Sequence, residues 1–158
     1  MLKIFKENPK AGSVGCRLHF ENNKVQHDGI KFFLDNNVIR VTHNSLNHYY
    51  NYSTNIRKDA GSTAALLCVR KNTFIKSGMF NETYRSCFED VELNVKILSM
   101  GFENYYDGSL VAYHYESQTR KESDEKSKIE YFDFINTLHP FLVKNWDVIK
   151  KYAFVINK

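Results

Sequence analysis

The chain has 158 residues, of which 42% are hydrophobic and 25% charged, as in an ordinary globular domain and unlike a disordered chain. Its formal net charge is +4, but no dense basic block interleaved with aromatic residues is present, so nucleic acid is not an expected partner. No run approaches the roughly 18 apolar residues of a membrane-spanning helix, and we expect no signal peptide at the N-terminus.

Cys16, Cys68 and Cys87 are odd in number and widely spaced, and they lack the clustering of a zinc site. Cys68 and Cys87 lie among apolar residues. We therefore expect reduced, buried thiols in a cytoplasmic protein, with the inner face of the membrane as a second location that the sequence allows.

A short helix and a β-hairpin are expected at the start of the chain. Residues 2–7 predict one or two helical turns that end before Pro9. Over Ser13–Phe20, Val14 and Cys16 alternate with their neighbours as in a strand. A second strand is expected at Lys24–His27, after a turn-forming Asn-Asn pair. This pattern is typical of two antiparallel strands joined by a tight turn.

The following segments predict a second hairpin and then a loop. Ile30–Leu34 and Val38–Val41 lie on either side of a polar turn, which favours an irregular hairpin. Residues 42–60 contain almost no aliphatic residues and include the pair Tyr49 and Tyr50. We expect a long loop or a short covering helix there, and long loops in compact domains are often functional.

The middle of the chain predicts a strand followed by a short helix. Thr63–Val69 is a continuous apolar run, which suits a buried central strand. Arg70–Ser77 predicts a helix, with Asn72 as its N-cap and Gly78 as the residue after its end.

Glu89–Met100 gives the clearest helical pattern. Its apolar residues form stripes on two sides, separated by a narrow polar strip made of Glu92, Lys96 and Ser99. Such a helix should be covered on two sides, and Gly101 is expected to end it.

The C-terminal part predicts one strand and two helices. Leu110–Tyr115 reads as a strand, and the mixed charges of residues 118–128 predict a solvated turn. Ile129–Leu138 predicts an amphipathic helix that stops at Pro140, and a second helix follows as far as Tyr152.

Adjacent carboxylates open the predicted helix at 89–100. Ser86 and Glu89 are spaced as a capping box, and acids in a first turn gain roughly 0.3–1 kcal/mol from the helix dipole. Asp90 projects about 100° further round the helix and is not needed for that role. As a general base such a carboxylate typically contributes about 10²–10⁴-fold to a rate. The spacing alone leaves both the structural and the catalytic interpretation open.

His114 is the other residue with possible chemistry. Strand alternation puts it on one face with Leu110 and Ala112, where a lone histidine is more often a hydrogen-bonded core residue than a ligand. As a ligand it would offer one imidazole to a divalent metal, and the chain has no DxD motif. The polar run Gln26–Gly29 is explained sufficiently by hairpin geometry.

Taken in order, these segments resemble the second half of family 2 glycosyltransferases of the GT-A type. The resemblance covers about residues 8–118, and its matches are Pro9–Phe20, Gln26–Gly29, Gly61–Arg70, Gly78–Glu82, Phe88–Leu93, Gly101–Phe102 and Ala112–Ser117. It implies an α/β chain with a partial GT-A fold, in which a mixed sheet carries flanking helices and two C-terminal helices. Residues 1–118 would form the half domain, and residues 119–158 a helical extension packed on it.

The resemblance also implies roles for individual residues. Asp90 corresponds to the catalytic base, with Glu89 as its partner, and His114 to the residue that helps to bind the metal and the diphosphate. Ala64 and Ala65 would line the floor of the acceptor and donor-sugar site. One departure is Glu92, where the family more often has Asp.

The activity implied is transfer of a sugar from a nucleotide-sugar donor to a hydroxyl of a glycan acceptor, with inversion and with Mg²⁺ or Mn²⁺ as cofactor. Such reactions commonly serve polysaccharide biosynthesis at the cell envelope. The half that carries the DxD motif would precede residue 1, so we expect the 158-residue chain alone to be inactive.

Two other classes of function stay open. The chain would be a non-catalytic carbohydrate-binding module if Tyr49, Tyr50 and Tyr52 form its binding surface. It would be a partner-dependent interaction module if an incomplete sheet exposes an edge, which would favour a homodimer. Peripheral association with a membrane is a further interaction that the mildly basic composition allows.

Overall fold

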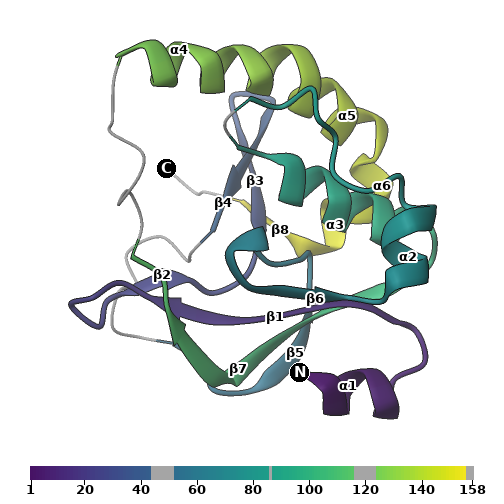
Figure 1. The fold of residues 1–158 in the computed structure, drawn as a ribbon. Coiled ribbons are helices and arrows are strands. Elements are labelled where there is room, and N and C mark those ends of the chain that lie inside the picture. The colour runs from purple at the N-terminus through teal and green to yellow at the C-terminus, as the bar shows by residue number, and fades with distance from the viewer. Residues whose placement is uncertain (44–51, 86, 116–123, 156–158) are drawn as a thin grey trace.

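The structure is a computed structural model that describes residues 1–43, 52–85, 87–115 and 124–155. Within them two β-sheets lie beside a group of helices, which confirms the mixed α/β class (Figure 1). The larger sheet contains β1 (Ala11–His19), β2 (Val25–His27), β5 (Ile56–Asp59), β6 (Leu67–Val69) and β7 (Glu103–Tyr113). The smaller sheet contains β3 (Lys31–Asp35), β4 (Val38–Thr42) and β8 (Ala153–Val155).

The helical segments frame these sheets. They are α1 (Leu2–Glu7), the 3₁₀ turn η1 (Ala64–Leu66), α2 (Lys71–Lys76), α3 (Glu89–Ser99), α4 (Asp124–Asp133), the π-helical segment η2 (Phe134–Leu138), α5 (His139–Lys144), α6 (Trp146–Ile149) and the 3₁₀ turn η3 (Lys150–Tyr152). In the described part of the chain no helix is both long and apolar enough to cross a membrane.

Strand β1 organises the larger sheet and is buried along its whole length. It pairs in parallel with β7 on one side and antiparallel with β2 and β6 on the other. The predicted hairpin of β1 and β2 is therefore confirmed. Strand β7 begins at Glu103, earlier than the predicted start at Leu110. The sequence pattern missed its first residues because they are polar or aromatic, although most of them are buried where β7 pairs with β1 and β5.

The second predicted hairpin is also present, with β3 and β4 antiparallel. It is more regular than expected. Asn36 and Asn37 both have positive φ, at 48° and 63°, which is the pattern of a two-residue type I′ turn whose twist matches that of the strands.

Helix α3 lies between the larger sheet and the C-terminal helices (Figure 1). The main apolar core gathers around it from β3, β4, α3, the helices after residue 133 and the segments next to β3, β5 and α3: Ile30, Phe32, Ile39, Ala60, Tyr84, Val91, Val95, Phe134, Leu138, Leu142 and Ile149. The expectation that this helix is covered on two sides is confirmed. The domain division at residues 118 and 119 stays a prediction.

The buried central strand predicted at Thr63–Val69 is wrong. Residues 64–66 form the turn η1, and β6 is a three-residue, half-buried strand that pairs with Ser13–Gly15 of β1. Ala65 and Leu66 are exposed. An apolar run records only the hydrophobicity of a segment, and it does not distinguish a central strand from a short one at an edge.

Pro140 does not end the helix that precedes it. The amide of His139 donates to the carbonyl of Phe134, five residues earlier, so the turn before the proline is a wide π turn. Pro140 follows near the start of α5, where a missing N–H disturbs least. The chain therefore stays helical from α4 through α5, and the predicted break is wrong.

Other local expectations also fail. Residues 56–59 form strand β5 rather than a loop or a helix, and β8 was not predicted. The N-cap of α2 is Arg70 and not Asn72, whereas Gly78 does follow its end with φ +84°. All three cysteines are free, but Cys16 is the buried one, and Cys68 and Cys87 are only half-buried.

Candidate functional site

The acidic pair stands at the very start of α3. Phe88 is the N-cap, with φ +84° and no side-chain capping bond, and Glu89 is the first helical residue. A capping box places its acid three residues after the cap. Phe88 therefore holds the cap position that the sequence assigned to Ser86. The predicted box of Ser86 and Glu89 stays a prediction, because Ser86 lies outside the described residues.

The carboxylate of Asp90 is buried, with 6% of the residue exposed. Its Oδ2 accepts a 2.9 Å hydrogen bond from the amide of Ala64, and its Oδ1 accepts one of 2.7 Å from the amide of Val91. Both donors are backbone amides, so the orientation of the carboxylate is fixed by the chain at Ala64 and at the start of α3. These two bonds use two of about four acceptor positions of a carboxylate, which leaves capacity to accept a proton.

The segment before Ala64 is fixed by Asn94, one turn further along α3. Its Nδ2 donates to the carbonyls of Ser62 and Asp90, and its Oδ1 accepts from the hydroxyl of Ser13 on β1. Gly61 lies so close that a Cβ there would be 2.3 Å from Cγ of Asn94. The segment 61–64 is thus held between β1 and α3.

A second motif joins this segment through His27. The amide of Thr63 donates a 3.3 Å hydrogen bond to Nε2 of His27, which must therefore be unprotonated at that nitrogen. Burial lowers the pKa of His27 well below its usual range, and the nearby His43, Lys31 and Arg57 lower it further. The ring of His27 is a neutral hydrogen-bond acceptor at the end of β2.

Sequence reasoning missed the ion-pair centre beside His27. The buried carboxylate of Asp59 lies 2.9 Å from Nζ of Lys31 and 2.9 Å from Nη2 of Arg57. Burial raises the pKa of Asp59, and the two cations oppose that shift without cancelling it. Strand β5 carries both Arg57 and Asp59, and because it has no apolar alternation, the sequence held no signal for it.

His114 meets the Gln26–Gly29 motif on its other side. Its Nδ1 lies 2.9 Å from Oε1 of Gln26, and its ring is half-buried. Successive side chains of a strand point to opposite faces, so Gln26 and His114 lie on the face of β2 opposite to His27. The role of His114 at a metal stays a prediction.

The residues described above do not form a complete binding site for a divalent metal. In residues 1–43, 52–85, 87–115 and 124–155 no three His, Cys, Asp or Glu side chains gather as a metal would require. His114 would supply a single imidazole, and further ligands would have to come from elsewhere.

The predicted substrate residues are found in different settings. Ala64 is half-buried and binds Asp90 through its amide, and the next residue, Ala65, is exposed. Ala64 is the last residue of the segment that Asn94 holds in place, and Ala65 comes directly after it in the chain. Tyr49 and Tyr50 lie outside the described residues.

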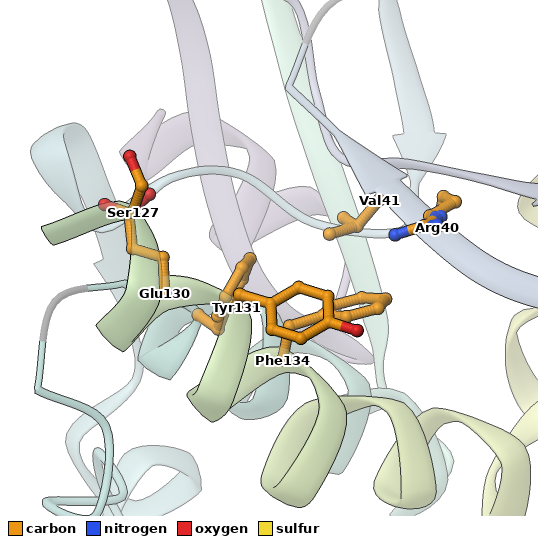
Figure 2. A pocket seen from close by; sticks show the side chains of 7 residues that line it. Arg40, Val41, Ser127, Glu130, Tyr131 and Phe134 are labelled. Atoms are coloured by element: carbon orange, nitrogen blue, oxygen red, sulfur yellow. The ribbon is translucent and has the colours of Figure 1, made fainter. Parts of the chain in front are cut away.

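A hollow of about 300 Å³ lies between β4 and the helical segments that follow residue 123. Figure 2 shows Ser127, Glu130, Tyr131 and Phe134 along one helical face, with Arg40 and Val41 across from them on β4. Phe88, the N-cap of α3, completes its lining. The hollow and the Asp90 carboxylate are thus built on the same helix start.

Comparison with known proteins gives a distant relationship. No family model matches the chain. It is 25% identical over 140 residues to the O-antigen biosynthesis protein RfbC of Myxococcus xanthus, a match that covers 86% of this chain and 11% of that protein. It is also 25% identical over 126 residues to the uncharacterized protein y4gI of Sinorhizobium fredii, which covers 77% of this chain and 14% of that one. The chain is a distant relative of an O-antigen biosynthesis protein.

Proposed function

We propose that this chain is the acceptor-side part of an inverting glycosyltransferase of the GT-A type. The observation that carries the proposal is the convergence of three separate motifs on Asp90. Ala64 binds its carboxylate directly, and the neighbouring Thr63 connects the same segment to His27. The distant relationship to an O-antigen biosynthesis protein supports a sugar substrate, because O-antigen is a polysaccharide.

In this proposal Asp90 is the general base, with Glu89 as its acidic neighbour. The carboxylate takes the proton of an acceptor hydroxyl, and the freed oxygen attacks the anomeric carbon of the donor sugar. The bond between that carbon and the diphosphate oxygen breaks, and the nucleoside diphosphate leaves with the electron pair. The amides of Ala64 and Val91 hold the carboxylate in one orientation before the transfer.

The acceptor hydroxyl would approach Asp90 past Ala65. This side chain is exposed next to the amide that binds Asp90, and its small size leaves room for a sugar ring. The nucleotide-sugar donor and a cytoplasmic location belong to the same proposal. A Mg²⁺ or Mn²⁺ ion would neutralise the departing diphosphate, and no step assigned here to Asp90 or Ala64 depends on that ion.

The test compares two substitutions that remove the same charge. Asp90→Asn is introduced into the complete protein that the cell produces. It should lower kcat for sugar transfer by about 10²-fold or more and leave the affinity for the donor nearly unchanged. Asp147→Asn is the matched control, because that carboxylate is 90% exposed. Near-normal kcat in Asp90→Asn would assign the residue a purely structural role.

A non-catalytic carbohydrate-binding module is the second candidate, and the hollow beside Phe88 favours it, since such a site needs no base. The two functions differ in one readout. A binding module would bind glycan but would release no nucleoside diphosphate from a sugar donor under any condition, whereas the transferase would release it in a reaction that depends on Asp90.

A further inference from the structure

We propose that the hollow between β4 and α4 binds one sugar ring of a glycan, as a subsite for the acceptor. Sugar binding at the hollow does not depend on the proposed function, but the assignment of that sugar to the acceptor rests on it. The volume of about 300 Å³ stands at the lower end of the range of small-molecule sites, roughly 300–1,000 Å³. It therefore suits a single sugar ring better than a complete nucleotide sugar.

The lining offers aromatic faces, which sugars bind well. Tyr131 is 64% exposed at the rim, and the buried Phe134 contributes to the lining below it. The ring of Phe88 packs 6.0 Å from that of Phe134 and adds a second apolar surface. The faces of such rings are electron-rich, and the C–H bonds on one side of a sugar ring present positive partial charge to them.

Polar groups at the same hollow match the hydroxyls of a sugar. Arg40 lies on one side, with its guanidinium carbon 5.4 Å from the centre of the Phe134 ring. Glu130 and Ser127 lie on the other side, on α4. Arginine only donates hydrogen bonds and a carboxylate only accepts them, whereas a sugar hydroxyl does both. A few such groups in an apolar hollow are what fixes the orientation of a small ligand.

The position of the hollow favours the acceptor. Phe88 lines it and is only two residues from Asp90, so their Cα atoms are at most about 7 Å apart. Phe88 also holds a left-handed backbone conformation that is unfavourable for a bulky residue. Conformations of this kind are retained mainly at binding and catalytic sites. A sugar seated against Phe88 would contact a residue that lies close in the chain to the one that the proposed function makes the general base.

The binding test uses the 158-residue chain and simple probes. Methyl glycosides of glucose, galactose, mannose, rhamnose and N-acetylglucosamine would be titrated into the labelled protein and followed by chemical-shift changes in NMR spectra. We expect at least one glycoside to shift the signals of Tyr131, Phe134 and Phe88. If none of them shifts these signals, the hollow is not a sugar site.

Two variants and a control locate the binding. Tyr131→Ala should weaken the affinity by about tenfold, as loss of an aromatic anchor does, and Arg40→Gln should weaken it by a smaller factor. Phe132→Ala is the control, because that neighbouring ring is 55% exposed but does not line the hollow. It should stay within about twofold of the original affinity. Equal losses in the variants and the control would overturn the proposal, and thermal melts verify that each variant is folded.

Failure of this inference can be told apart from failure of the proposed function. Asp90→Asn should leave glycoside binding to the hollow unchanged while it lowers kcat for transfer by about 10²-fold or more. If transfer depends on Asp90 but Tyr131→Ala leaves KM for the acceptor unchanged, the hollow is not the acceptor subsite and the enzyme assignment stands. If glycosides bind the hollow and no transfer depends on Asp90, the sugar site stands and the enzyme assignment fails.

Discussion

The phenol of Tyr84 donates a 2.6 Å hydrogen bond to the carboxylate of Glu92, eight residues later. The same carboxylate lies 2.6 Å from Nζ of Lys96 and accepts from Nδ2 of Asn81. The helical pattern had placed Glu92 on a solvated strip, whereas the residue is only 4% exposed. Glu92 therefore ties the turn before α3 to the helix and belongs to the interior of the protein.

The first prediction concerns the hydroxyl of Tyr84. Tyr84→Phe leaves the ring in the core but removes a hydrogen bond to a charged group, so it should lower the free energy of unfolding by about 1.5–3 kcal/mol. Urea unfolding measures this difference. Tyr115→Phe is the control, because Tyr115 is 54% exposed, and it should change stability by less than about 0.5 kcal/mol. A loss for Tyr84→Phe no larger than that of the control would contradict the assignment.

The second prediction concerns acid and Glu92. Burial alone would raise the pKa of this carboxyl group, but hydrogen bonds from Lys96, Tyr84 and Asn81 outweigh burial and hold the pKa below its ordinary value of 4.5. A folded pKa that is lowered stabilises the protein above the unfolded pKa, and this contribution is lost as the pH falls through the folded pKa.

Glu92→Gln should therefore be less stable than the original protein at pH 7, and the difference should shrink below pH 4.5. Unfolding by urea at a series of pH values gives the comparison. A difference that stays constant from pH 7 to strongly acidic pH would show that the charge of Glu92 contributes nothing.

The third prediction concerns His27, whose pKa is lowered well below 6.5 by burial and neighbouring charges. The unfolded chain binds a proton near pH 6.5 that the folded chain does not, so stability is full above this pH and falls as the pH decreases. One proton corresponds to a slope of about 1.4 kcal/mol per pH unit. His27→Gln keeps an acceptor for the amide of Thr63 but does not titrate, and it should remove this slope.

NMR titration gives an independent check on His27. Its ring should stay in the neutral form at pH 6.5 and below, with the proton on Nδ1, because Nε2 accepts from Thr63. A ring that titrates with a midpoint at or above pH 6.5 would contradict the buried, neutral state.

The fourth prediction compares two glycines. Gly61→Ala would place a Cβ 2.4 Å from Cβ of Asn94, which cannot move without breaking its hydrogen bonds to Ser13 and Ser62. We expect a loss of about 3 kcal/mol in stability. Gly101→Ala meets open space and only an unfavourable φ of +83°, so its loss should be about 1–2 kcal/mol. Thermal unfolding of both variants ranks them, and the reverse order would refute the close contact at Gly61.

Local signals predicted the parts of the fold that local chemistry determines. Asn36 and Asn37 carry the positive φ values of a tight hairpin turn, and Gly101 carries that of a helix end. Pairing between distant segments has no such signal. Strand β5 is polar and exposed on alternate residues, and its partner β7 lies more than forty residues further along the chain. Pro140 failed as a signal because a π turn accommodates it.

The candidate site was predicted in its parts and not in its connections. The order of the motifs singled out Asp90 and the segment around Ala64. The spacing of Ser86 and Glu89 suggested Ser86 as the cap, whereas Phe88 holds that position in the structure. The bonds from Ala64 to Asp90 and from Thr63 to His27 span 26 and 36 residues, so only the folded chain brings these groups together. The hollow beside Phe88 is formed between β4 and α4, and no pattern in the sequence predicted that these two elements would meet there.

Strand β8 has a consequence for the order in which the protein assembles during synthesis. It pairs in parallel with β3, more than a hundred residues earlier, and until it leaves the ribosome β3 and β4 can form only an isolated hairpin. Such hairpins are marginally stable in water, and contacts between distant segments form slowly. The smaller sheet should therefore be the last to form, and a nascent chain without β8 should expose Phe33, which stacks on Phe154 in the finished protein.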